Sequence, residues 1–408
     1  MILQIAWKNI WRNKLRSGII LGAIAIGLFS GTFLSAFMMG WVNYQIKTDI
    51  DQQISHIQIH QKKYMDNHDL SEYFMRNDVA EKLQHIPEIK QVAYRVRING
   101  MLASAANVTG VQINMIDPEE EWKVSTLYET IPDTSGTFFQ DSVFRSMPIV
   151  ISSKTAERLK VRLKSKVVLT FQDMNGEMVS FAFRVSGIFK TTNTMFDEGN
   201  IFVRQSDVFA STGLPEGAVH EAAILLNQFE QGDKVTPEVQ QLFPDMDVSD
   251  WKALVPALAL SLSWMDMITF IVLGIFLLAL AFGIVNTMLM AVLERTRELG
   301  MLMCIGMNKK KVFSMIMLET LFLTLLGSVV GIFAGWLVIH FTSANGMDLS
   351  FMIKDHFEDF GFGSIVYPEF NFRTFAIIVV LVFITGILSA IYPALKALKL
   401  NPVEAVRQ

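Results

Sequence analysis

The sequence predicts an α-helical membrane protein with four transmembrane helices and a large extracytoplasmic α+β domain inserted between the first two helices. Four apolar stretches, residues 19–42, 267–293, 312–341 and 374–395, each exceed the roughly 20 residues that cross a hydrocarbon layer of about 30 Å. They are unevenly spaced, because 224 mostly polar residues separate the first two but only 18 and 32 residues separate the later ones. The longest connection is sufficient for a folded domain.

Basic residues mark the predicted cytoplasmic side of the membrane. They precede the first stretch and fill the 18-residue connection: Lys8, Arg12, Lys14, Arg16, Arg295, Arg297, Lys309, Lys310 and Lys311. Because Lys and Arg concentrate in cytoplasmic loops, both termini are expected in the cytoplasm and the large domain outside. The only cysteine, Cys304, lies in a cytoplasmic connection, so the exported domain is expected to fold without disulfides.

The order of segments follows from these stretches and their flanks. Residues 1–17 predict a cytoplasmic helix along the membrane surface, because Ile2, Ile5, Trp7 and Ile10 fall mostly on one side; the alternative is a simple flanking segment. The remaining segments are transmembrane helix 1 (18–44), the extracytoplasmic α+β domain (45–264), transmembrane helix 2 (265–293), a cytoplasmic helix (294–311), transmembrane helix 3 (312–341), an extracytoplasmic loop (342–373), transmembrane helix 4 (374–395) and a cytoplasmic tail (396–408).

Short strands interleaved with short helices predict the α+β fold of the exported domain. The expected strands are 55–60, 91–98, 107–116, 148–152, 166–172, 178–189, 200–204 and 221–226, and the expected helices are 79–85, 154–159, 205–211 and 236–242. The clearest hairpin spans 166–189, where Asn175 and Gly176 favour the positive φ angles of a tight primed turn. A more β-rich insertion is expected at about 117–199.

No enzyme motif is present in the sequence, so no catalytic, cofactor-binding or metal site is expected in this chain. The absence of a Gly-Lys dipeptide excludes a Walker phosphate loop, and there is no H-E-x-x-H sequence or cysteine pair to hold zinc. His56 and His60 share one face of an expected strand, roughly 13 Å apart, and are interpreted as surface histidines. The net charge of −4 argues against a nucleic-acid partner.

Three glycines in the third span predict a helix contact. Gly327, Gly331 and Gly335 repeat every four residues, which places all three on one face of the helix. Small residues on one face let another helix approach closely, so this face is expected to pack against a neighbouring helix. The alternative is that glycine is simply common in membrane helices.

Two polar residues within the spans predict further contacts. A carboxylate inside a membrane is costly unless it is paired, and Glu319 lies in the third span, about two turns from its cytoplasmic end. Glu319 is interpreted either as a polar contact that moves during a transport cycle or as an acid paired with a nearby cation, such as Arg297 or Lys311. Asn286 in the second span is a candidate for a hydrogen bond between helices.

The most specific pattern in the chain lies at residues 286–335. They read NTMLMAVLERTRELGMLMCIGMNKKKVFSMIMLETLFLTLLGSVVGIFAG. This segment resembles the FtsX-like permease domain, in which a span ends in E-R-T-R-E-x-G before a short apolar helical turn and a basic start to the next span. The sequences N-K-L-R-S at 13–17, Y-P-A at 392–394 and L-N-P-V-E-A at 400–405 resemble the same family.

The resemblance implies the permease subunit of an ABC transporter of the mechanotransmitting kind. Two four-span subunits, identical or related, are expected to pair, and a dimer of separate ATPase subunits is expected to bind ATP and Mg. A coupling helix within 294–311 would seat on the ATPase through Glu294, Arg295, Thr296, Arg297, Glu298, Leu299, Met301 and Cys304. Its charged residues offer directional ion pairs for that docking, and the alternative is a simple positive-inside stop signal.

Three branches of this family differ in how well they match the chain. A cell-division branch usually has a smaller exported domain, and a macrolide-exporter branch carries a fused ATPase. The lipoprotein-releasing branch has separate ATPase and permease chains, and stretches beginning at Gly110, Ser186 and Trp251 loosely resemble its exported domain. The resemblance to this branch therefore implies release of lipoproteins from the outer leaflet of a bacterial inner membrane toward a periplasmic carrier protein. Macrolide or peptide efflux and ATP-driven regulation of a cell-wall hydrolase are the alternatives.

The acyl chains of such a substrate would occupy an apolar cleft at the outer ends of the first two spans, among membrane lipids. The expected lining, contributed across the dimer axis, is Phe33, Phe37, Met38, Trp41, Trp264, Met267, Ile268 and Ile271. The alternative is an ordinary aromatic belt at the membrane interface.

Overall fold

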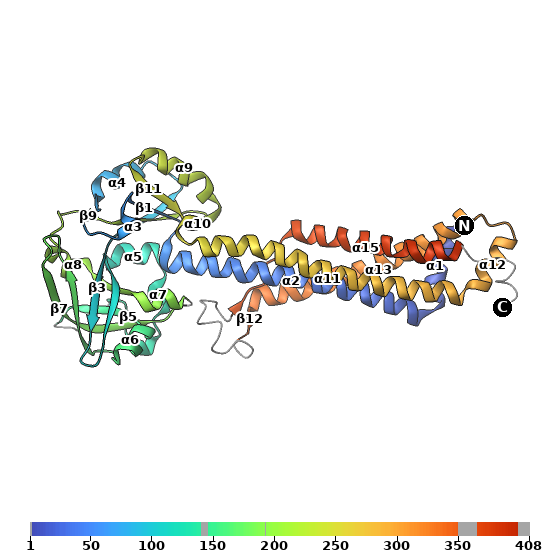
Figure 1. Ribbon diagram of the computed structural model, residues 1–408, viewed down its shortest axis with the longest axis horizontal. Helices are drawn as coiled ribbons and strands as arrows, with labels where there is room; N and C mark the ends of the chain where they lie inside the picture. Colours follow the sequence, from blue (N-terminus) through green and yellow to red (C-terminus); the bar gives the residue numbers. More distant parts are fainter. Residues whose placement is uncertain (1, 140–145, 192, 350–364, 399–408) are drawn as a thin grey trace. The chain divides into compact units, whose positions relative to one another are not determined.

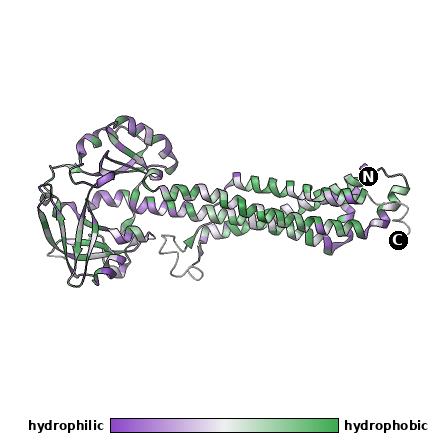
Figure 2. Cartoon of the chain, viewed as in Figure 1, coloured by the Kyte–Doolittle hydropathy of each residue, from purple (hydrophilic) through white to green (hydrophobic). Residues whose placement is uncertain are grey.

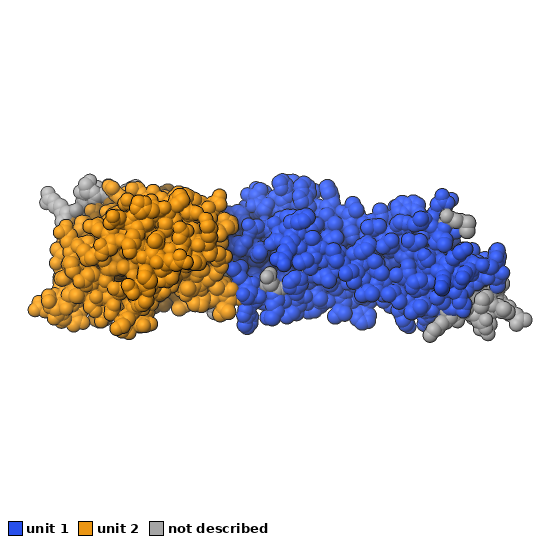
Figure 3. All heavy atoms as spheres, turned by 90° about the horizontal axis from the view of Figure 1, so that it is seen from above, with its two compact units in different colours: residues 1–44, 261–348, 365–408 blue, residues 45–260, 349–364 orange. Residues whose placement is uncertain are grey.

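The computed structural model describes residues 2–139, 146–191, 193–349 and 365–398, and it divides into two compact units. Unit 1 contains residues 1–44, 261–348 and 365–408, and unit 2 contains residues 45–260 and 349–364 (Figure 3). Part of the expected outer loop (350–364) and most of the expected tail (399–408), including its L-N-P-V-E-A sequence, lie outside the described residues.

Unit 1 is built mainly from long apolar helices (Figure 1). Among the described residues, four helical segments are long and apolar enough to cross a membrane. They are α2 (Lys14–Asp49) with its continuation η1 (Ile50–Ile54), α11 (Pro256–Glu294), α13 (Lys309–Asn345) and α15 (Phe372–Leu398). Figure 2 shows hydrophobic residues along these helices, and each contains one of the four apolar stretches of the sequence.

Two short helices accompany the long ones in unit 1. They are α1 (Ile2–Arg12) and α12 (Thr296–Cys304). The apolar side of α1 packs against α13: Ala6 and Ile10 are fully buried, and the ring of Trp7 meets the ring of Phe322 edge-on at 5.6 Å. Part of the apolar face of α1 is therefore buried against α13, and only the rest of that face is available to a membrane surface.

Unit 2 carries one sheet of nine strands within the described residues, in the order β11-β1-β10-β3-β4-β8-β5-β7-β6. The strands are β1 (Ile57–Gln61), β3 (Ile89–Ala103), β4 (Val108–Ile116), β5 (Pro148–Ser152), β6 (Lys166–Gln172), β7 (Met178–Phe189), β8 (Asn200–Arg204), β10 (Glu221–Leu226) and β11 (Met246–Asp250), and β2 (Phe74–Met75) pairs separately with β9 (Ala218–Val219). The helices are α3 (Tyr64–Asn67), α4 (Arg76–Leu83), α5 (Pro118–Val124), α6 (Ser153–Leu159), α7 (Thr194–Gly199), α8 (Gln205–Val208), α9 (Gly232–Leu242) and α10 (Trp251–Leu254).

Six strands of this sheet close into a ring because β3 pairs on both of its edges. Gly100 of β3 lies opposite Val111 of β4 and also opposite Phe171 of β6, and the pairings β4–β8, β8–β5, β5–β7 and β7–β6 complete the circle. Three of the six strands, β3, β4 and β8, come from outside the range 117–199. The β-rich part is therefore not the contiguous insertion that the sequence suggests.

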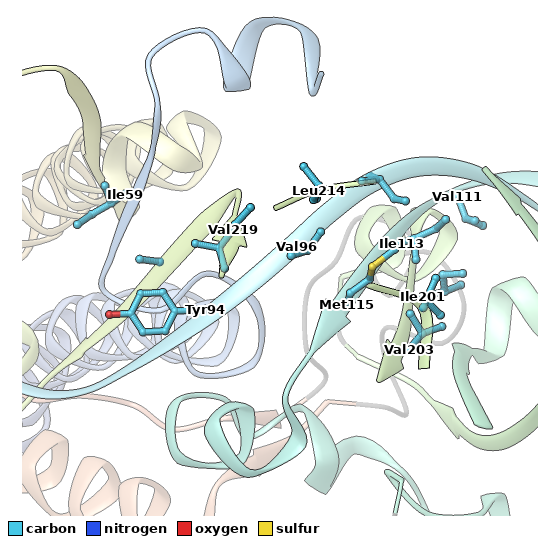
Figure 4. Close-up of a cluster of buried hydrophobic side chains, with 14 of the residues drawn as sticks. Ile59, Tyr94, Val96, Val111, Ile113, Met115, Ile201, Val203, Leu214 and Val219 are labelled. Carbon is cyan, nitrogen blue, oxygen red and sulfur yellow. The ribbon is translucent and has the colours of Figure 1, made fainter. Parts of the chain in front are cut away.

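The hydrophobic core of unit 2 consists of one large cluster and two smaller ones among the described residues. Figure 4 shows Ile59, Tyr94 and Val219 together with side chains of the ring, and all of them belong to a single cluster of buried residues. Ring members of the cluster include Val111, Ile113, Met115, Ile201 and Val203. The fifteen-residue strand β3 extends from the ring to the strands outside it, β10, β1 and β11. The ring and these outer strands therefore contribute side chains to the same cluster.

The predicted hairpin is present, but its turn differs from the expected one. Strands β6 and β7 are antiparallel, with Gln172 opposite Met178, so five residues connect them. Only Gly176 has a positive φ, of +84°, whereas a primed two-residue turn requires positive φ at Asn175 as well. Asp173 explains the longer turn, because its carboxylate accepts hydrogen bonds from the backbone N–H groups of Asn175 and Glu177 at 2.9 and 2.8 Å.

Candidate functional site

The expected coupling segment forms a helical elbow. Helix α11 ends at Glu294, Arg295 leaves the helical conformation with φ −101° and ψ 14°, and α12 begins at Thr296. After α12, Gly306 adopts φ +98°, a value that glycine reaches without steric cost. Asn308 then caps α13 by accepting a hydrogen bond from the N–H of Lys310 at 3.2 Å. The short helix is thus defined at both ends by local chemistry.

Ion pairs tie this elbow to the N-terminal helices. Arg12 Nη2 contacts both carboxylate oxygens of Glu298 at 2.7 Å, and Arg16 lies 3.8 Å from Glu294. Two of the charged residues that the sequence analysis offers to an ATPase are therefore paired within this chain. Arg12 and Glu298 are half exposed, so this pair remains open to exchange with another protein.

Arg295 points into unit 1, which corrects its expected role as a docking residue. Arg295 is 8% exposed. Its Nη1 lies 3.2 Å from both carboxylate oxygens of Glu319, and its Nη2 donates to the backbone oxygen of Asn9 at 3.2 Å. Glu319 is therefore paired with a nearby cation, and that cation is Arg295. The pair joins the elbow to α13 and α1.

A cavity of about 330 Å³ lies beside α12. Its lining combines apolar residues of α1, α11, α12 and α13 with the two ion pairs: Ile5, Asn9, Arg12, Met288, Ala291, Val292, Arg295, Glu298, Leu299, Met301, Leu302, Ile305, Met315, Ile316 and Glu319. Leu299 is buried, whereas Met301 and Ile305 are 45% and 86% exposed. Cys304 is exposed, and Arg297 makes no ion pair with any described residue. The Nε of Arg295 is buried without a hydrogen-bond acceptor among the described residues.

The three glycines of α13 lie against α2. A Cβ built on Gly327 would come within 2.9 Å of Ile24, one on Gly331 within 2.7 Å of the Ala25 carbonyl, and one on Gly335 within 2.6 Å of the Thr32 hydroxyl. Real Cβ atoms essentially never approach other atoms this closely, so only glycine allows this helix separation.

The residues of the expected substrate cleft occupy two different helices of the chain. On α2, Phe33, Phe37 and Trp41 form a half-buried column, with ring centroids 6.3 and 6.4 Å apart. On α11, the exposed residues are Trp264, Met267, Ile268 and Ile271, all more than two-fifths exposed. Of the eight expected residues, Met38 alone lines the small cavity between α2, α11 and α15, of about 20 Å³. A single chain therefore presents two apolar surfaces rather than a closed cleft.

Unit 2 contains a buried charge cluster that the sequence analysis missed. Arg95 of β3 contacts Glu121 of α5 and Glu221 of β10, each at 2.6 Å, and Arg97 contacts Glu221 at 2.5 Å. Glu221 is fully buried, which by itself would raise its pKa, but Arg97 and Arg95 outweigh burial and hold the pKa at about 2. Burial alone would lower the pKa of Arg95, and Glu121 and Glu221 raise it instead.

His60 and His220 complete the cluster. The structure also corrects the interpretation of His56 and His60 as surface residues. His56 is 8% exposed and His60 is fully buried. The ring of His60 stacks on Tyr64, and Tyr64 stacks in turn on His220. Burial lowers the pKa of His60, and it lowers the pKa of His220 to about 4. The only signal in the sequence was the charged and polar residues within otherwise apolar strands, at Arg95, Arg97 and Glu221.

The described residues contain no cluster of three or more His, Cys, Asp or Glu side chains that could hold a metal ion. Neither the elbow nor the buried cluster combines a nucleophile with a general base in a cavity. The chemistry of both sites is that of ion pairing and packing, which suits movement and docking of protein parts.

Comparison with known proteins agrees with this organisation. The MacB-like periplasmic core domain matches residues 17–242, and the FtsX-like permease C-terminal domain matches residues 270–402. The chain is 28% identical over 232 residues to an uncharacterised ABC transporter permease of Methanocaldococcus jannaschii, covering 55% of each protein. It is 24% identical to the lipoprotein-releasing system transmembrane protein LolC of Neisseria meningitidis, covering 75% of each.

A third relative aligns with nearly the whole chain. The pyoverdine export ATP-binding/permease protein PvdT of Pseudomonas entomophila is 24% identical over 419 residues, which cover 99% of this chain and 59% of that protein. The chain thus spans little more than half the length of the archaeal and pyoverdine relatives. With a MacB-like periplasmic core over more than half of its length and an FtsX-like domain after it, the chain belongs to the FtsX/MacB-type family of ABC transporter permeases.

Proposed function

We propose that this chain is the membrane subunit of an ABC exporter, in which separate ATPase subunits dock on α12 and drive movements of unit 2. The elbow at α12 carries the proposal, because it presents exposed apolar residues beside a cavity of about 330 Å³. A cavity of about 150 Å³ already holds a benzene ring, so this one accommodates an apolar side chain of a partner.

The position of charges supports the proposed orientation, with both termini in the cytoplasm of a bacterial cell. Lys8, Lys14, Lys309, Lys310 and Lys311 surround the ends of α1, α2 and α13 and are exposed. Cytoplasmic flanks of membrane helices are enriched in such residues. In this orientation α12 faces the compartment that contains ATP, and unit 2 lies outside the membrane.

For the substrate, we propose a lipoprotein that leaves the outer leaflet of the inner membrane for a periplasmic carrier protein. Trp264, Ile268 and Ile271 recur on one side of α11 and are 60%, 43% and 55% exposed. Burial of acyl chains on such a surface is favourable by about 0.8 kcal/mol for each CH₂ group. The likeness to LolC, which extends over three-quarters of both proteins, supports the same choice. In a pair of permease copies, this surface of α11 would face the aromatic column on α2 of the other copy.

Efflux of a small molecule or peptide is the second candidate. It is favoured by the relative named as a pyoverdine exporter, whose alignment covers 99% of this chain. The two candidates differ in what the apolar surface of α11 binds, so the ligand that stimulates ATP hydrolysis distinguishes them.

Docking of the ATPase is tested by affinity purification of the full chain from its host in mild detergent. Mass spectrometry is expected to find an ABC ATPase with the wild-type chain. Replacement of Met301 and Ile305 by Glu is expected to remove it, because a charge in an apolar contact is costly to desolvate. The matched control is Met195→Glu, at an exposed methionine of unit 2. Purification without any ATPase would refute the proposed function.

The substrate is tested in the purified complex reconstituted into lipid nanodiscs. A triacylated lipopeptide is expected to stimulate ATP hydrolysis by the wild-type complex, and Ile271→Glu is expected to abolish the stimulation. Val329→Glu on α13, at another exposed apolar position, is the control for the cost of a charge in the membrane. Stimulation by a peptide or macrolide, but not by the lipopeptide, would favour efflux.

A further inference from the structure

The first membrane helix ends inside unit 2, and its last carbonyl groups are all hydrogen-bonded. Helix α2 continues without a break into η1, as one helical segment from Lys14 to Ile54. The last four carbonyls of a helix normally have no partner within the helix and turn to water or to capping groups. Here five consecutive carbonyls, from Ile50 to Ile54, accept hydrogen bonds.

The donors to these carbonyls come from several elements of unit 2. The N–H of Thr126 donates to Asp51 at 2.7 Å, and the hydroxyl of Ser125 donates to Gln52 at 2.9 Å; both donors directly follow α5. Arg95 Nη1 of β3 donates to the Gln53 carbonyl at 3.1 Å. The remaining two donors, the N–H of Ser55 and the amide of Gln58, lie on the chain that leaves the helix toward β1.

We call the hydrogen-bonded end of η1 the joint. Arg95 lies at its centre, because the guanidinium contacts the carbonyl of Gln53 and two carboxylates at once. Besides the Gln53 carbonyl, it donates to Glu221 of β10 at 2.6 Å and to Glu121 of α5 at 2.6 and 2.9 Å. Its side chain is 5% exposed, so these contacts are made in a medium that screens charge poorly. A positive charge also interacts favourably with the C-terminal end of a helix dipole.

A joint of this kind transmits force rather than acting as a hinge. Hinges are segments with few contacts that absorb changes of φ and ψ, whereas every carbonyl of η1 is fixed and Ile50 and Ile54 are buried. We propose that Arg95 is the positioning residue through which displacement of the first membrane helix passes into the central strands of the exported domain. The inference rests on the proposed function. It specifies the residue through which the proposed movement passes from α2 to the sheet of unit 2.

The test compares two conservative variants of neighbouring arginines. Arg95→Lys keeps a positive charge beside Glu121 and Glu221, but a lysine ammonium cannot reproduce the planar fork that reaches three groups. Arg97→Lys is the matched control, because Arg97 lies two residues away on β3, contacts the same Glu221, and extends to Gln112 instead of the helix end. A general effect of weakening the charge cluster would appear in both variants.

The readout is amide hydrogen exchange in the full chain with its copurified ATPase, with and without ATP trapped by a hydrolysis-deficient ATPase variant. In the wild type and in Arg97→Lys, ATP is expected to change exchange in η1 and also in β3 and β10. In Arg95→Lys, the change in β3 and β10 is expected to fall by roughly fivefold or more, the lower range of an allosteric coupling, while the change in η1 persists. The rate of ATP hydrolysis, measured separately with the active ATPase, is expected to persist as well. A purely structural defect would raise exchange equally in both nucleotide states.

The outcomes separate the two proposals. A full ATP-dependent change in β3 and β10 of Arg95→Lys would overturn the joint and leave the exporter intact. The absence of any ATP-dependent change in the wild type would refute the proposed function and the joint with it. If Arg95→Lys does not fold, Ser125→Ala removes the hydrogen bond to Gln52 without leaving a buried charge, and it is expected to reduce the change in β3 and β10 in the same direction.

Discussion

The two units bury their charges in opposite ways. In unit 2, the side chains of Arg95, Arg97, Glu121 and Glu221 form one compact cluster between the sheet and α5, and the ion-pair distances are 2.5 to 2.6 Å. In unit 1 the pairs are separate and graded, from the buried Arg295–Glu319 pair at 3.2 Å to the half-exposed Arg12–Glu298 pair. Short, mutually supporting pairs resist rearrangement, whereas separate pairs near solvent exchange at low cost. The difference suggests a fixed joint at one site and an adjustable docking surface at the other.

The largest expected effect comes from removing the centre of the compact cluster. Arg95→Met leaves Glu121 buried without its cation and should reduce the free energy of unfolding of unit 2 by about 3–5 kcal/mol. The measurement is urea-dependent hydrogen exchange of β3 and β10 in the full chain. Arg76→Met is the control, because its pair with Glu120 is partly exposed and should cost less than about 1 kcal/mol. Equal losses in both variants would mean that burial does not distinguish the pairs.

The histidines of the same cluster predict a dependence on pH. The pKa of His220 is lowered from 6.5 to about 4 in the folded chain by burial, so the unfolded chain binds a proton more readily. The stability that His220 contributes is therefore complete above pH 6.5 and is lost as the pH falls toward 4, by about 3 kcal/mol. His220→Gln should flatten the pH dependence of exchange protection in β10, whereas His85→Gln, at an exposed histidine, should not. An unchanged slope in His220→Gln would contradict this assignment.

Unit 1 should be sensitive to added volume where α13 packs against α2. Gly331→Ala places a Cβ 2.7 Å from the Ala25 carbonyl, and overpacking of this kind costs about 1–3 kcal/mol. The control is Gly274→Ala on α11, where no atom lies within 4 Å of the added Cβ. Thermal denaturation of the chain in detergent measures both variants. If the two melt together, the close approach of α13 to α2 does not exist in the membrane protein.

The smallest effect is expected at the half-exposed ion pair of unit 1. Arg12→Met removes a half-exposed ion pair with Glu298 and should lower stability by less than about 1 kcal/mol in the same denaturation measurement. Arg295→Met removes the buried pair with Glu319 and should cost more. A larger loss at Arg12 than at Arg295 would reverse the graded order of these pairs.

Local patterns predicted the strands well, and contacts between distant segments explain what they missed. Strands β5, β6, β7, β8 and β10 have the predicted bounds, because alternation and β-branched residues act over a few positions. The burial of His60 could not be predicted, because its neighbours Glu221 and His220 come from far along the chain. The same holds for closure of the ring, which depends on β3 pairing with both β4 and β6.

The elbow shows a second limit of sequence reasoning. Helical periodicity would predict which way Arg295 points only if α11 and α12 were one helix. Because the chain leaves the helical conformation at Arg295, the periodicity of α11 does not continue into α12. The side chain of Arg295 therefore points inward, while that of Glu298 remains at the surface. The glycines of α13 were predictable by contrast, because they lie within one uninterrupted helix and their spacing alone defines a face.

The pairing of β1 has a consequence for how the protein is made. Ile57 of β1 lies opposite Ile224 of β10 on one side and Asp250 of β11 on the other. During synthesis both edges of β1 therefore stay unpaired until nearly the whole domain has been made. Exposed strand edges invite pairing with other chains, and long-range pairing is slow. Synthesis of this chain thus passes through an aggregation-prone interval that ends only when β11, just before α10 and α11, has been made.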